Sequence, residues 1–589
     1  MKKYLLLFIT TAIALTGCED QLNPIDENLR SFEDIYNNPV FAEAYLMNAY
    51  SRIPTNSNSF NDVATDNAVT NDKASGYLII ATGAWTAINN PLNQWDNSFT
   101  AIMYLNRFLA EVENVEWSYR DERTRELYYK RHKGEAHALR ALFMYYLLKH
   151  HGGEGPDGTL LGVPIYTEPF DTDTDFRNKP RNTFAECVQQ IYTDLEEAAK
   201  YLPLDYGNVR TVANIPEMYS DYTMESYNRV FGDLNRQRIS GRIAEGVKAK
   251  TALLAASPAF NKHNDIQLWE EAANSAATVL NRIDGIAGLD PVGDRFFTDV
   301  NIDRIRLAIG RDQLEMLWRT SLEGAPGSRW RQEFNYPPSL FGDGRVNPSQ
   351  NFVDAFPCVD GFPINHSNSR FNPNEPYVNR DPRLQRTVVY DGSTFSGNPV
   401  YTREGNTIDG IEAAINSTRT GYYLRKLMRE DVSIEPGATI DRRHYNVHIR
   451  YTEIFLIYAE AANEAWGPTG TGGSAYSAKD VIAAIRQRAG ITQPDNFLAS
   501  INDQDAMREL IRNERRLELS FEGFRFWDLR RWNKNLNEPV KGVRITHHDG
   551  TNQYNYIEVE SREFDNHMIY GPIPYDEVLK ANLVQNKGW

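Results

Sequence analysis

Nine segments of the chain carry apolar residues three and four positions apart, the spacing that places them on one face of an α-helix. Asn182-Thr183 precedes one segment as a capping signal, and Ser257-Pro258 follows another, where proline cannot continue a helix. Short turns separate several segments, which predicts a mainly α-helical fold of tetratricopeptide-like helix pairs, although no clean repeat of about 34 residues is present. The segments are 41–50, 100–112, 126–149, 184–202, 243–256, 268–283, 449–465, 477–489 and 504–521.

Between the helical segments the composition changes. Residues 204–242, 284–304, 323–376 and 390–441 are rich in Gly, Pro, Asn, Asp and Ser and contain few regular runs. Irregular connections of this length are uncommon in a compact protein unless they serve a function. We therefore expect a helical scaffold that presents a binding surface built from loops.

The first eighteen residues resemble a secretion signal. Lys2 and Lys3 precede an apolar stretch at 4–15, which ends in the small-residue sequence Leu15-Thr16-Gly17-Cys18. This order is typical of a bacterial lipoprotein signal, in which residues 1–17 are removed and Cys18 carries the lipid. The apolar stretch is shorter than the roughly 20 residues that a membrane-spanning helix needs. The alternative is an ordinary secretory signal with a chance cysteine.

Charge and cysteine content restrict the classes of ligand. Removing residues 1–17 takes away two of the 63 lysines and arginines and none of the 79 acidic residues, so the formal net charge changes from −16 to −18. Such a chain is a poor partner for nucleic acid or for an anionic membrane surface.

Beyond Cys18 only Cys187 and Cys358 remain. They could pair in an oxidising compartment, but their spacing indicates no disulfide framework, and we expect two buried free thiols.

Motifs spread almost from end to end of the chain resemble signatures of the SusD/RagB family. Each motif is weak alone, and the combination is specific. The lipoprotein signal and the Asn23-Pro24 pair fit the same pattern. The motifs are Ser257-Pro258-Ala259-Phe260-Asn261, Asn347-Pro348-Ser349-Gln350, Val353-Asp354-Ala355-Phe356, Asp381-Pro382-Arg383-Leu384, Gly421-Tyr422-Tyr423-Leu424-Arg425-Lys426, the stretch 450–461, Glu514-Arg515-Arg516-Leu517-Glu518-Leu519 and the stretch 523–529.

This resemblance implies a lipid-anchored outer-membrane protein that faces the medium, captures oligo- or polysaccharide and delivers it to a SusC-type TonB-dependent transporter. Glu19 and Asp20 resemble the acidic residues that direct such lipoproteins to the cell surface. The family fold is an α-helical scaffold of tetratricopeptide-like pairs with an irregular ligand-binding region. We expect a signal at 1–17, a tether at 18–30, an N-terminal region at 31–240 and a C-terminal region at 241–589, which together form one compact unit.

The motifs near the C-terminus are interpreted as scaffold. Arginine and acidic side chains alternate there at spacings that favour ion pairs along and between helices, and the aromatic residues among them supply packing. Arginine beside aromatic side chains is common where helices join. The charged residues are Arg515, Arg516, Arg525, Arg530, Arg531, Glu514, Glu518, Glu522 and Asp528.

Sequence motifs for catalysis and for cofactors are missing, and we expect a binding protein without cofactor or metal. The chain has no His-Glu-x-x-His, no Gly-x-x-x-x-Gly-Lys-Ser/Thr and no Gly-x-Ser-x-Gly. The run 171–175 begins like a calcium loop but lacks the glycine and glutamate of such a loop, and His150-His151 is interpreted as surface histidine. Two alternatives stay open. One is a surface glycosidase, which needs two suitably spaced carboxylates, and the other is a receptor for peptides or host glycoproteins.

A glycan site needs aromatic platforms for the C–H faces of sugar rings and polar side chains for their hydroxyls. Two loop stretches combine these residue types, one before the helix at 100–112 and one at 329–338. We predict that Trp330 and Trp95 are platforms of one surface, although Trp95 could instead anchor its helix. The candidate ligand-binding residues are Trp330, Trp95, Trp85, Tyr336, Asp66, Asn71, Asn93 and Arg329.

Overall fold

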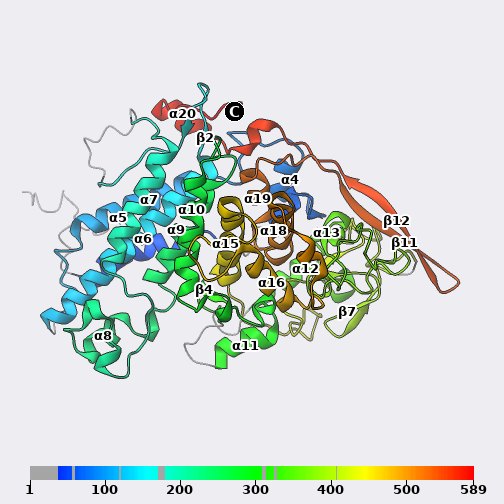
Figure 1. Cartoon of the computed structure of the whole chain (residues 1–589), viewed down its shortest axis with the longest axis horizontal. Helices are drawn as coiled ribbons and strands as arrows, with labels where there is room; N and C mark the ends of the chain where they lie inside the picture. The colour runs from blue at the N-terminus through cyan, green and yellow to red at the C-terminus, as the bar shows by residue number, and fades with distance from the viewer. Residues whose placement is uncertain are drawn as a thin grey trace, which may run out of the picture.

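The computed structural model describes residues 38–55, 60–118, 121–169, 179–307, 314–323, 328–405 and 407–589. The predicted signal and tether, with Cys18, and the acidic run 171–175 lie outside the described residues. The fold is mainly α-helical, as predicted, with long helices gathered in one half and shorter elements and loops in the other (Figure 1). Within the described ranges, no helix is both long enough and apolar enough to cross a membrane.

All nine predicted helices are present, with ends shifted by a few residues. Thr183 and Glu186 form a reciprocal capping box at the start of α7, and α9 stops at Ala256, directly before Ser257-Pro258. The scaffold helices are α3 (Pro39–Ser51), α5 (Trp95–Glu111), α6 (Glu122–His151), α7 (Phe184–Ala199), α9 (Gly241–Ala256), α10 (Ile266–Asn281), α15 (Tyr451–Trp466), α16 (Ala478–Ala489) and α18 (Gln504–Glu518).

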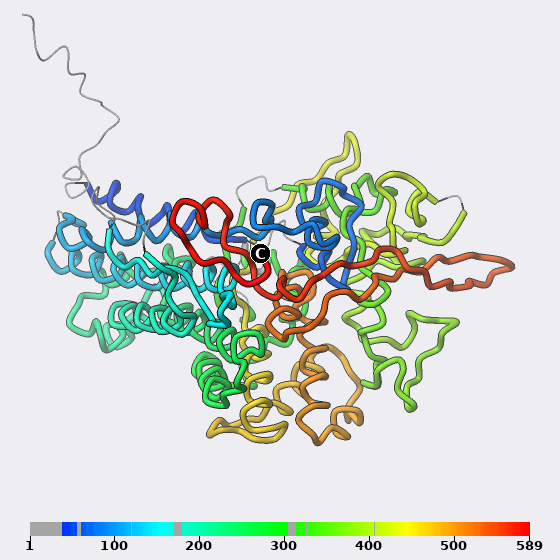
Figure 2. Tube along the Cα trace, turned by 90° about the horizontal axis from the view of Figure 1, so that it is seen from above, coloured from blue at the N-terminus to red at the C-terminus, as the bar shows by residue number. Residues whose placement is uncertain are grey.

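The scaffold helices stack largely in chain order. Contacts join α3 to α5, α5 to α6, α6 to α7, α7 to α9, α9 to α10 and α10 to α15, while α16 and α18 pack on α15. Figure 2 shows this stack from above, with the colour passing from blue to green across it. Helices inside the stack have neighbours on more than one side, so they bury several faces. The main core draws on residues from Ala42 to Leu583, on both sides of the 240/241 boundary.

The other half consists of short elements joined by long loops. The strands there pair only two by two: β1 with β5, β4 with β10, β6 with β9, and β7 with β8. The short helices of the chain are α4 (Tyr77–Ala81), α8 (Met224–Phe231), α11 (Asp299–Leu307), α12 (Trp330–Asn335), α13 (Gln350–Ala355), α14 (Arg383–Thr387), α17 (Asn496–Ser500), α19 (Arg525–Arg531) and α20 (Tyr575–Ala581). The short strands are β1 (Ala68–Thr70), β2 (Gly153–Glu154), β3 (Leu160–Leu161), β4 (Met316–Arg319), β5 (Val346–Pro348), β6 (Val388–Val389), β7 (Ser393–Phe395), β8 (Asn398–Val400), β9 (Tyr423–Leu424) and β10 (Val447–Arg450).

A long β-hairpin projects from the loop half (Figure 1). It consists of β11 (Val540–His548) and β12 (Thr551–Glu560), which pair antiparallel with His548 opposite Thr551. The two turn residues, Asp549 and Gly550, both have positive φ. An Asp-Gly pair between two stretches of strand-forming residues is a strong hairpin signal, because this turn type needs positive φ at both positions. This hairpin was not among the predicted elements.

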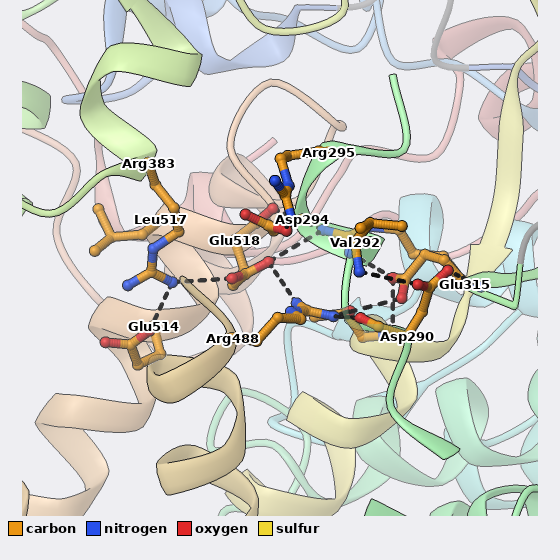
Figure 3. Close-up of polar contacts among 12 residues, drawn as sticks. Asp290, Val292, Asp294, Arg295, Glu315, Arg383, Arg488, Glu514, Leu517 and Glu518 are labelled. Atoms are coloured by element: carbon orange, nitrogen blue, oxygen red, sulfur yellow. Dashed lines mark hydrogen bonds and ion pairs between the residues drawn. The ribbon is translucent and has the colours of Figure 1, made fainter. Parts of the chain in front are cut away.

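A buried network of ion pairs joins the loop half to the scaffold (Figure 3). Glu518, at the end of α18, lies 3.0 Å from both Arg383 and Arg488. Arg488 also lies 3.5 Å from Glu315, and Arg383 lies 2.8 Å from Glu514. Burial works to raise the pKa of Glu518, but the surrounding arginines outweigh burial and lower that pKa to about 2. The family motif at 514–519 therefore holds elements together, as predicted.

The arginines between residues 515 and 531 form the ion pairs that the scaffold interpretation predicts, with the exception of Arg530. Arg515 pairs with Asp528 at 3.1 Å, Arg531 pairs with Glu460 at 2.5 Å, and Arg516 and Arg525 both pair with Asp66 at 2.8 Å. Arg530 has no carboxylate partner among the described residues and donates instead to the Met568 carbonyl.

Candidate functional site

Pairing of β1 with β5 brings two segments that are far apart in the sequence side by side. Thr70 lies opposite Val346. Beyond the strand, the Asn71 Nδ2 donates to the carbonyl oxygens of Asp343 and Gly344 at 3.0 and 2.9 Å. The segment around β1 therefore lies beside the residues that directly follow the predicted glycan-binding stretch 329–338.

A cavity of about 270 Å³ lies where the two segments meet. Helix α12 begins with Trp330, and Phe334, four residues later on the same helix face, also lines the cavity. The lining residues are Phe60, Val63, Thr70, Asp72, Ser75, Tyr77, Trp330, Phe334, Asn335, Arg345 and Val346.

The cavity combines partly exposed aromatic rings with polar groups that are held in place. Trp330, Phe334 and Tyr77 are all partly exposed, and the Trp330 and Phe334 ring centroids are 6.1 Å apart. The Arg345 guanidinium lies 4.0 Å from the centre of the Phe334 ring and 3.2 Å from Asp72. Both contacts fix the orientation of the guanidinium. Aromatic faces beside a fixed guanidinium and a carboxylate suit a ligand with apolar faces and hydroxyl edges.

Trp85 and Trp95 lie in the core and do not line this cavity, which corrects the prediction for both. Trp95 is 5% exposed, and its ring packs edge to face on Phe99 and His151, with centroids 4.8 and 5.4 Å apart. It is the first residue of α5, so the alternative interpretation as a helix anchor describes it. Trp85 is 2% exposed and packs on Trp589 at 4.8 Å.

Tyr336 and Asp66 are buried structural residues, which also corrects the prediction. The Tyr336 hydroxyl donates to the Arg429 carbonyl at 2.5 Å. Asp66 accepts two hydrogen bonds from Arg525, at 2.9 and 2.8 Å. Burial works to raise the pKa of Asp66, but Arg516 and Arg525 outweigh burial and hold that pKa well below its usual range.

The remaining predicted residues do not line the cavity. Asn71 lies next to the lining residue Asp72 and uses its amide for the backbone contacts described above. Arg329 directly precedes Trp330 and pairs with Glu333 and Asp441 at 2.8 and 2.9 Å. Asn93 lies at the start of α5, where its Oδ1 accepts from the Trp95 amide at 2.8 Å.

Only Trp330 of the eleven lining residues was among the predicted ligand-binding residues. The ten others are Phe60, Val63, Thr70, Asp72, Ser75, Tyr77, Phe334, Asn335, Arg345 and Val346. Phe334 had a usable signal, because an aromatic four residues after Trp330 shares its face in any helix. Tyr77 and Arg345 had none, since they reach the cavity through the distant pairing of β1 with β5.

Other potential sites are less suitable for a glycan. A second cavity, of about 970 Å³, lies along α7, α9 and the loop that follows α7, but its aromatic lining residues, Tyr206 and Tyr227, are buried. In the part of the chain that the structure describes, no group of three or more His, Cys, Asp and Glu residues is placed to hold a metal ion.

The histidine pair on α6 is buried, contrary to the surface interpretation. The ring nitrogens Nδ1 of His150 and His151 contact the carbonyl oxygens of Tyr146 and Pro572, each at 2.7 Å. Burial lowers the pKa of His151 to about 4. Cys187 and Cys358 are buried free thiols, as predicted.

Two family models match this chain. The model described as "SusD family" matches residues 313–589, and the model described as "Starch-binding associating with outer membrane" matches residues 20–217. Together the two matches extend over most of the chain.

A relative and two solved structures agree with these models. The SusD-like protein P38 of Formosa agariphila is 25% identical, over 92% of this chain and 95% of the relative. A SusD-like protein from Bacteroides fragilis superposes with a TM-score of 0.71 at 22% identity, covering 96% of this chain and 100% of that one. A SusD-like carbohydrate binding protein from the same species has a TM-score of 0.67 at 21% identity, covering 92% and 98%. The chain therefore belongs to the SusD/RagB family.

Proposed function

We propose that this protein captures oligo- or polysaccharide in the cavity between Trp330 and Tyr77. The observation that carries the proposal is the aromatic pair of Trp330 and Phe334 beside the ion pair of Arg345 and Asp72. One structurally similar protein is a carbohydrate binding protein, which supports the same ligand class. Asp72 is the single carboxylate among the described lining residues, whereas glycosidases use two, so we propose binding without catalysis.

Replacing Trp330 by alanine is expected to lower glycan affinity about ten- to hundredfold, because a stacked ring contributes roughly 1–3 kcal/mol. The melting temperature should change little, since Trp330 is partly exposed. The measurement is calorimetric titration of both proteins with soluble glycans of different backbones and with peptides, together with analysis for cleavage products.

A matched control is Tyr575→Ala, which removes an aromatic ring that is 46% exposed at the start of α20, outside the cavity. Its glycan affinity should equal that of the unaltered protein. Equal affinity of Trp330→Ala and the unaltered protein would contradict the proposed site. Binding of peptides alone would favour the peptide receptor, and release of sugar products would favour the glycosidase.

We also propose that Cys18 anchors the protein by lipid in the outer membrane, facing the medium, where it delivers glycan to a SusC-type TonB-dependent transporter. The support is the lipoprotein signal and a matching family model whose description associates it with the outer membrane. A tether keeps both partners in one plane and so raises their effective concentration.

Purification from native membranes in mild detergent, at natural expression levels, should recover a TonB-dependent transporter with this protein. Cys18→Ser should move the folded protein into the soluble fraction, because lipid is the proposed attachment. Repeated recovery of the protein alone would count against the transporter. Firm membrane association of Cys18→Ser in cells without the transporter would count against the anchor.

A further inference from the structure

Arg530 is a buried cation that pairs with no carboxylate of the described residues. It is 3% exposed, its Nε donates to the Met568 carbonyl at 2.9 Å, and its Nη1 has no hydrogen-bond partner in the part of the chain that the structure describes. Burial lowers the pKa of this guanidinium to about 9. Buried charges in proteins are normally paired, because leaving a charge uncompensated in the interior is costly.

Lys149, on α6, is a partly exposed cation that lies beside the same indole ring as Arg530. Its Nζ lies 4.3 Å from the centre of the Trp527 ring, and the Arg530 guanidinium lies 5.0 Å from that centre. Lys149 has no hydrogen bond or ion pair with any described residue. Burial, with the nearby charge of Lys250, lowers the pKa of Lys149 to about 7.

Both cations border one small cavity of about 60 Å³. Tyr145 also lines it, one helical turn before Lys149 and so on the same face of α6, and its hydroxyl has no partner in the described ranges. One water takes up roughly 10–15 Å³ of the volume of such a cavity, so this cavity has room for several waters or one small ion. An ammonium, a guanidinium and a phenol hydroxyl thus surround the same space.

The other charged residues around the cavity are already paired. Lys250 lies 2.7 Å from Glu453. Arg515 and Arg531 lie 3.1 and 2.8 Å from Asp528. The two unpaired cations therefore leave the cavity with excess positive charge.

We propose that this cavity is an anion-binding site in which a small inorganic anion, such as phosphate or chloride, neutralises Lys149 and Arg530. Because these side chains come from α6 and α19, the anion would join the helical stack to the C-terminal family motif. No residue that lines this cavity lines the proposed glycan cavity, so the two sites are distinct.

The test is thermal unfolding of the purified protein at constant ionic strength. Potassium gluconate, whose anion is too large for the cavity, is replaced stepwise by potassium phosphate or potassium chloride. A ligand that binds only the native state stabilises it, so the melting temperature should rise by several degrees and saturate with one or both anions. An unchanged melting temperature in both series would overturn the proposal, and the series that saturates identifies the anion.

Lys149→Met retains an unbranched apolar side chain against Trp527 and removes the charge. It should abolish the anion-dependent rise, and in gluconate it should melt at or above the temperature of the unaltered protein, since it removes a positive charge that lies beside the same Trp527 ring as the buried Arg530 guanidinium. Lys133→Met, on the same helix, removes a lysine that is paired with Glu113 at 3.0 Å and should keep the full rise. A full rise in Lys149→Met would overturn the proposal.

Arg530→Met provides a second variant with the same expected loss, should Lys149→Met fail to fold. Crystals grown with bromide give a further readout that needs no variant. An anomalous peak beside Lys149 and Arg530 is expected. A cavity without that peak, at a bromide concentration that raises the melting temperature, would place the ion elsewhere and overturn the proposal.

Discussion

Replacing Arg450 by methionine is expected to lower the free energy of unfolding by about 3–5 kcal/mol, among the largest effects of any single substitution in this chain. Arg450 is 1% exposed. Its guanidinium donates to Glu315 at 2.7 Å, to Glu522 at 2.7 and 2.9 Å, and to the Glu518 carbonyl at 2.7 Å. Methionine fills similar space but leaves buried carboxylates without part of their counter-charge. Denaturant unfolding of both proteins measures the difference.

Arg229→Met is the matched control for Arg450→Met. Arg229 pairs with Glu225 at 2.9 Å on α8, and its side chain is 34% exposed, so the pair is solvated and should contribute at most about 1 kcal/mol. Adding Glu315→Gln to Arg450→Met should recover part of the loss, because the double variant removes one uncompensated carboxylate. Equal losses in Arg450→Met and Arg229→Met would contradict the buried-network assignment.

The long helices were predictable because their signal is local. Apolar spacing and capping residues lie within the segment that they specify, as at α7 with its Thr183–Glu186 capping box. Strands of two or three residues carry no such signal. The pairing of β1 with β5 joins segments far apart in the sequence, and no periodicity within either strand identifies its partner.

The ion-pair function of the C-terminal motifs was also predictable, but the choice of partners was not. Spacing along a helix favours pairs three and four residues apart, such as Arg531 with Asp528. Arg516 and Arg525 instead converge on Asp66, from the other end of the chain. Arg530, on the same helix as Arg531, pairs with no carboxylate of the described residues, and no local pattern indicates this.

In the candidate site, too, the residue types were predictable from local sequence, but their burial depends on residues distant in the sequence. Trp330 and Trp95 both follow polar, turn-rich sequence, so the two residues had similar signals. Their environments differ because His151, at the end of α6, covers the Trp95 ring, whereas Trp330 opens α12 beside a cavity. Burial by a residue distant in sequence decides which tryptophan can contact a ligand.

Replacing Trp95 by alanine is therefore expected to destabilise the protein by about 3–5 kcal/mol, because a large buried ring leaves a cavity that the surrounding core fills only in part. Glycan affinity, measured well below the lowered melting temperature, should stay within about twofold of the original value, since Trp95 does not line the proposed glycan cavity. Trp95→Phe, which keeps an aromatic ring against Phe99, should lose less stability. Trp330→Ala should show the opposite combination, with affinity lost and the melting temperature kept. A Trp95→Ala protein that melts normally but fails to bind glycan would show that this ring contacts the ligand.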